Sequence, residues 1–159
     1  RQMYERAFET HPDLLAARVL TGRNLTLVHG DVHVANFLFP YHSPASRAYL
    51  IDWHTLDFEP QCWLGAADVA YMICHYWFPE RRQALKTDIL ERYYHRLQEN
   101  GVTNYTWDEF WYDYRLAAIN SLYVPVMRSN RHNSWNWYPQ FEKAASSFAD
   151  LNCAELLKG

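Results

Sequence analysis

Three side chains that could support phosphoryl-transfer chemistry lie close together in the first third of the chain. The segment L-V-H-G-D-V-H-V-A-N-F-L contains Asp31 and, five residues later, Asn36. Asp52 follows after two short apolar runs, F-L-F and Y-L-I. Carboxylate and amide oxygens are suitable ligands for Mg²⁺, and a nearby carboxylate can accept the proton of a hydroxyl group. An Asp base, an Asn five residues later and a second Asp after a hairpin fit a metal-assisted transfer of phosphate.

Short strands are needed to bring these residues together. The apolar run 25–28 predicts a buried strand, or an extended entry, that leads into the loop containing Asp31. The two later apolar runs flank the turn-rich segment 40–48 and predict a β-hairpin. If Phe37 pairs with Ile51, Asn36 and Asp52 face each other at the open end, roughly 5 Å apart. The sequence therefore predicts a hairpin that carries a Mg²⁺ site.

The remainder of the chain is predicted to be mainly helical. The mixed-charge pattern of residues 1–20 predicts a helix that breaks near Pro12. Thr106 and Glu109 form a capping-box pattern at the start of a further helix. That helix is expected to run to about Val124, where Pro125 should kink or stop it. Further helices are expected over residues 66–77, 79–100 and 139–157. No repeat or linker interrupts the chain, so residues 1–159 are expected to form one α+β, mainly helical domain.

Composition excludes several classes of protein. The chain has 159 residues, 49% of them apolar, which is enough for a buried core. A net charge of −3 gives no reason to expect a nucleic-acid partner, and no apolar run is long enough for a membrane span. The three cysteines are widely spaced and match neither a metal nor a disulfide pattern, which favours reduced thiols in the cytoplasm.

The motifs H-G-D-V-H-V-A-N, L-I-D-W and G-A-A-D-V-A together resemble the aminoglycoside phosphotransferase and choline kinase-like family, and above all its ecdysteroid-kinase-like members. The resemblance implies the C-terminal lobe of a protein-kinase-like fold. It implies ATP-dependent phosphorylation of a hydroxyl on a small molecule, in a group that acts on antibiotics, amino alcohols, sugars and steroids. It implies these roles: Asp31 as catalytic base, Asn36 and Asp52 as Mg²⁺ ligands, and His29, His33 and Asp68 as support for the catalytic loop.

The chain departs from this family in one large respect. It has five glycines and no G-x-G-x-x-G segment, and its first lysine is Lys86, well after the catalytic loop. The sequence also starts at Arg1 rather than Met. We expect the N-terminal lobe that grips ATP to be absent from this chain and to lie upstream or on another chain. The fragment alone is expected to have little or no kinase activity.

Two alternative functions, and the residues that would contact the acceptor, remain open from the sequence. Trp135 and Trp137 lie in a polar segment and are candidates for contact with the acceptor. The chain could instead be a non-catalytic kinase-like lobe that serves as a binding module. The D-x-H pattern at Asp31, together with Asp52 and His54, could also belong to a two-metal phosphoesterase, which would use Mn²⁺, Zn²⁺ or Fe and no ATP.

Overall fold

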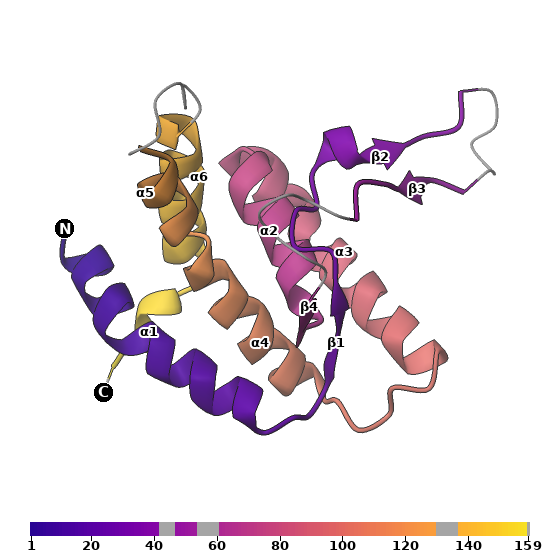
Figure 1. Cartoon of the computed structure of the whole chain (residues 1–159), viewed down its shortest axis with the longest axis horizontal. Helices are drawn as coiled ribbons and strands as arrows, with labels where there is room; N and C mark the ends of the chain where they lie inside the picture. Colours follow the sequence, from indigo (N-terminus) through magenta and orange to yellow (C-terminus); the bar gives the residue numbers. More distant parts are fainter. Residues whose placement is uncertain (42–46, 54–60, 130–136, 159) are drawn as a thin grey trace.

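The computed structural model describes residues 1–41, 47–53, 61–129 and 137–158, which are mainly helical (Figure 1). The helices are α1 (Gln2–Leu20), α2 (Ala66–Tyr76), α3 (Pro79–Glu99), α4 (Trp107–Asn120), α5 (Tyr123–Ser129) and α6 (Trp137–Asp150). Two short 3₁₀ turns, η1 and η2, cover Val34–Asn36 and Cys153–Glu155. The strands are β1 (Leu25–Val28), β2 (Phe37–Leu38), β3 (Tyr49–Leu50) and β4 (Gln61–Leu64). The predicted α+β, mainly helical class is confirmed.

The core lies between α2, α4 and α6, which pack on one another. Small residues on α2, such as Ala70, allow close approach to the large side chains Phe110 and Ile119 of α4 and to Phe148 of α6, all of them buried. The capping box predicted at the start of α4 is present: Thr106 Oγ1 accepts from the Glu109 amide, and the Glu109 carboxylate accepts from the Thr106 amide.

The first helix is attached to this core by a buried ion pair. Asp113 on α4 is fully buried and accepts hydrogen bonds from Arg18 at 2.7 and 2.6 Å and from the Tyr105 hydroxyl at 2.6 Å. Closer to the N-terminus of α1, His11 contacts the carbonyl of Leu116 at 3.0 Å. These contacts explain why α1 lies along α4 in Figure 1.

The predicted break at Pro12 is wrong, because α1 continues through it. A proline removes one helical hydrogen bond, and here its ring lies on the exposed side of the helix while contacts on both sides of it fix the helix to α4. The end of α4 also differs from the prediction: the helix ends at Asn120, and Pro125 lies in the first turn of α5, where a missing N–H costs little. The last helix begins at Trp137 and ends at Asp150, before the left-handed residue Asn152.

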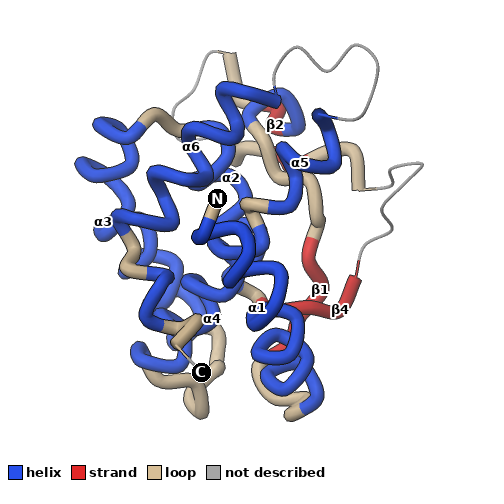
Figure 2. Tube along the Cα trace, turned by 90° about the vertical axis from the view of Figure 1, so that its left-hand side faces the viewer, coloured by secondary structure: helices blue, strands red, loops and turns tan. Residues whose placement is uncertain are grey.

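The strands form two separate antiparallel pairs, β1 with β4 and β2 with β3. In Figure 1 the β2–β3 hairpin extends away from the helices, and in Figure 2 β1 and β4 lie at one edge of the helical body. The prediction of a buried first strand holds only for its last residue: Val28 is buried, whereas Leu27, on the opposite face of the strand, is 61% exposed.

The predicted register of the hairpin is wrong by one residue. Phe37 pairs with Leu50, not Ile51, so Asn36 lies opposite Ile51 and accepts its amide at 2.9 Å. Asp52 lies beyond the paired residues and has a left-handed backbone with φ of 64°. There the chain turns back, and Trp53 donates its indole N–H to the Leu50 carbonyl at 2.9 Å. Because side chains alternate along a strand, a shift of one residue changes which of them face each other.

No helix in the described part of the chain is both long enough and apolar enough to cross a membrane.

Candidate active site

The loop that follows β1 is fixed to the first turn of α2 by one carboxylate. Asp68 accepts the amide of His29 at 2.8 Å and that of Gly30 at 2.9 Å. Gly30 has a φ of 83°, a backbone conformation that a side chain would make unfavourable. These bonds orient the loop so that the next residue, Asp31, follows a fixed backbone.

His29 connects this loop to the base of the hairpin. Its ring is 1% exposed and accepts the amide of Asp31 at Nδ1, at 3.2 Å. Because Nδ1 accepts, the proton of a neutral ring lies on Nε2, which donates to the carbonyl of Ile51 at 2.9 Å. His29 therefore connects the loop to the residue that also pairs with Asn36.

Asn36 lies at the far end of the loop and is 6% exposed. Its amide nitrogen donates to the backbone carbonyl of Asp31 at 3.0 Å, so the side-chain oxygen Oδ1 is the atom left to face a ligand. Asp52 is exposed and lies two residues after the last paired residue of the hairpin, Leu50. An amide oxygen and a carboxylate are hard donors that fit Mg²⁺. No group of three or more His, Cys, Asp and Glu side chains in the described ranges gathers as a metal site.

The carboxylate of Asp31 has a different neighbour at each oxygen. The hydroxyl of Tyr71 on α2 donates to Oδ1 at 2.8 Å, and Nε2 of His33 lies 3.5 Å from Oδ2. About a quarter of the Asp31 side chain, 26%, remains exposed. Tyr71 is not among the site residues predicted from the sequence, although it follows Asp68 by three residues and so lies on the same side of the helix.

His75 lies one further turn along α2, with its ring centroid 4.8 Å from that of Tyr71. It is 1% exposed, and neither ring nitrogen has a hydrogen-bond partner among the described residues. Burial lowers the pKa of His75 to about 3, and the positive charges of Arg128 and Lys143 act in the same direction. The ring is therefore neutral in the folded chain at ordinary pH.

The remaining predicted site residues lie apart from these contacts or outside the description. Trp137 is the first residue of α6, is 37% exposed and packs edge-on against Tyr138. Trp135 and His54 lie outside the described residues.

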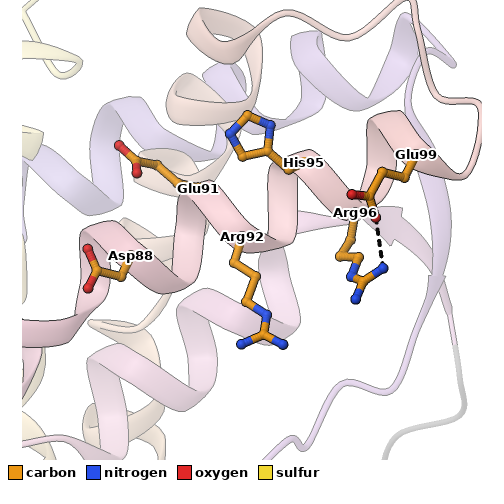
Figure 3. A pocket seen from close by; sticks show the side chains of 6 residues that line it. All are labelled: Asp88, Glu91, Arg92, His95, Arg96 and Glu99. Carbon is orange, nitrogen blue, oxygen red and sulfur yellow. Dashed lines mark hydrogen bonds and ion pairs between the residues drawn. The ribbon is translucent and has the colours of Figure 1, made fainter.

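A shallow concavity is present on α3, and it shares no residue with the loop that carries Asp31. Figure 3 shows its charged lining along one helix, including the ion pair of Arg96 with Glu99 at 2.8 Å. The lining residues are Asp88, Glu91, Arg92, His95, Arg96 and Glu99. Because all of them come from one exposed helical face, the concavity has no opposing wall and is not the candidate active site.

Comparison with known protein families gives a match. The model of the Ecdysteroid kinase-like family matches residues 2–103, a range that includes the loop carrying Asp31, the hairpin and the first turn of α2. Searches of the curated proteins and of the solved structures found no match to this chain.

Proposed function

The chain belongs to the ecdysteroid kinase-like family, and on this premise we propose that it transfers a phosphate group from ATP to a hydroxyl of a small molecule. The observation that carries the proposal is the environment of Asp31. Its carboxylate lies on a loop whose backbone is bonded to Asp68, His29 and Asn36, and part of it remains open to solvent. A fixed and accessible carboxylate is what a general base for an alcohol requires.

In this proposal Asp31 orients the acceptor hydroxyl and accepts its proton. The acceptor oxygen forms a bond to the γ-phosphorus as the bond between that phosphorus and the β–γ bridging oxygen breaks, which leaves ADP. Asn36 and Asp52 would bind Mg²⁺, which neutralises charge on the phosphate oxygens. Asn36 suits this role because its amide nitrogen already bonds to the loop, so the side chain is oriented with its oxygen free to bind a cation.

We assign nucleotide binding to a second lobe, located upstream or on another chain. The surface of the hairpin supports this assignment, because Leu38, Phe39 and Tyr49 are 54%, 66% and 66% exposed. Adjacent exposed apolar side chains on one small hairpin favour a covering partner. The described chain alone would then bind the acceptor and metal but turn over little ATP.

The test is phosphate transfer from ATP by the complete parent protein with Mg²⁺. The family name makes ecdysone the first acceptor to assay, followed by choline, an aminoglycoside and glucose. Asp31→Asn should lower turnover by about 10²-fold or more, because the amide cannot accept the proton. Asp88→Asn, on the exposed face of α3, is the matched control and should leave turnover unchanged.

Near-normal turnover in Asp31→Asn would remove Asp31 as the base. Phosphate release from a phosphomonoester with Mn²⁺ and without ATP would favour the hydrolase instead. Binding of ATP or acceptor with no transfer would favour a binding module.

A further inference from the structure

We propose that Tyr71 is a positioning residue for the catalytic base: it binds Oδ1 of Asp31 and thereby makes Oδ2 the oxygen that receives the acceptor proton. This inference rests on the proposed function and adds to it a residue on α2 and a specific atom of the base.

The direction of the Tyr71 hydrogen bond follows from counting donors. A phenol has one O–H and a carboxylate has none, so the 2.8 Å contact between Tyr71 and Oδ1 can only be donated by Tyr71. The Tyr71 oxygen also lies 3.5 Å from the Tyr76 oxygen, and in that weaker contact Tyr76 must be the donor. The hydroxyls therefore form a chain from Tyr76 through Tyr71 to Asp31.

Tyr71 keeps its proton under all ordinary conditions. Burial raises the pKa of Tyr71 well above its usual value, and the contacts with Tyr76 and Asp31 raise it further. Oδ1 is therefore occupied by a donor at every pH at which the protein would work. An oxygen with a short hydrogen bond of this kind is a weaker proton acceptor than its neighbour on the same carboxylate.

The other oxygen lies on the open side of the site. Nε2 of His33 lies 3.5 Å from Oδ2, which is too long for a strong hydrogen bond. Both Asp31 and His33 are partly exposed, at 26% and 23%. The His33 ring packs against Tyr76 with a centroid distance of 5.5 Å. The acceptor hydroxyl would therefore approach Oδ2 past His33 and Tyr76.

Asp68 and Tyr71 act on the loop from one side of α2. Asp68 bonds to its backbone, and Tyr71, three residues later, bonds to the carboxylate that the backbone presents. The first contact sets where Asp31 lies, and the second sets how its carboxylate is rotated.

The experiment compares Tyr71→Phe with Tyr94→Phe in the complete parent protein, with Mg²⁺, ATP and whichever alcohol of the panel above is phosphorylated fastest. Tyr94 is a matched control, since its hydroxyl donates one hydrogen bond of 2.9 Å to the Tyr105 carbonyl, away from Asp31. Tyr71→Phe should lower kcat about tenfold, because a hydrogen bond to a charged group is lost in the transition state. The KM for ATP should stay within twofold of wild type, and the Tm should match that of Tyr94→Phe. A merely structural role of Tyr71 would instead lower the Tm below that of the control.

The outcomes separate this inference from the proposed function. A kcat for Tyr71→Phe within twofold of the control, with Asp31→Asn inactive, overturns the positioning role alone. Near-normal turnover in Asp31→Asn overturns both, as does a wild-type protein that phosphorylates no alcohol of the panel. Adding Tyr71→Phe to Asp31→Asn should lower kcat by less than a further twofold, and a full tenfold further loss would show that Tyr71 does not act through Asp31.

Discussion

The contact between Asp68 and the loop that carries Asp31 gives a prediction that can be tested without any substrate. In Asp68→Ala the amides of His29 and Gly30 both lose their acceptor. A hydrogen bond to a charged group contributes about 1.5–3 kcal/mol, and a buried donor left without a partner costs about 1–3 kcal/mol. His29 is buried, so its amide carries most of the loss, whereas Gly30 is exposed and water can replace the carboxylate there.

The expected cost is therefore about 2–4 kcal/mol in the free energy of opening the loop. At about 1.4 kcal/mol for each factor of ten, protection of the His29 amide against hydrogen exchange should fall roughly 30- to 700-fold. Asp68→Asn should lose less, because its amide oxygen still accepts one of the two bonds. Asp88→Ala serves as control, since Asp88 lies on the exposed face of α3.

Amide exchange measured by NMR or mass spectrometry reads this quantity directly. Unchanged protection of the His29 amide in Asp68→Ala, in a chain whose helices remain folded, would refute the reasoning. A loss spread equally over α4 would also refute it, because the structure confines the contact to the loop and α2.

Two further predictions concern stability and are measured by urea unfolding. Asp113→Ala should lower the free energy of unfolding by about 3–5 kcal/mol, because Arg18 and Tyr105 lose a fully buried partner, while Arg1→Ala at an exposed ion pair should change it by less than about 0.5 kcal/mol. A loss for Asp113→Ala below about 1 kcal/mol would contradict this ranking. Between pH 6.5 and about pH 3 the unfolded chain binds a proton at His75 that the folded chain does not, so stability should fall by about 1.4 kcal/mol per pH unit as pH decreases. His75→Leu should flatten that slope, and an unchanged slope would show that His75 titrates in the folded chain.

Local sequence signals predicted the helices well. Pro79 begins α3, Gly101 follows its end with a φ of 90°, and the capping box at Thr106 starts α4. Each of these features depends on a few neighbouring residues, so the sequence carries the information directly. The continuity of α1 through Pro12 could not be read in this way, because it depends on contacts with α4, far away in the chain.

The register of the hairpin is the part of the site that could not be predicted from the sequence. Two three-residue apolar runs are compatible with more than one pairing, and what selects Phe37 with Leu50 is the left-handed turn at Asp52 and the return of Trp53 to Leu50. The turn contains no glycine, the residue that most often marks a left-handed backbone, so Asp52 gives only a weak local signal for it. The spacing of three residues between Asp68 and Tyr71 places both on one side of α2. This spacing points to a contact between Tyr71 and the loop only once Asp68 is known to bond to that loop.

The backbone of Ile51 connects the hairpin to the loop through two hydrogen bonds. Its N–H binds the carbonyl of Asn36 and its own carbonyl binds the ring of His29, so a single peptide segment is fastened to both ends of the loop that carries Asp31. A tilt of β2 and β3 would consequently reorient both ends in the same event. Anything that binds the hairpin and the molecule that binds beside Asp31 should therefore influence each other's affinity, by the same factor in either direction.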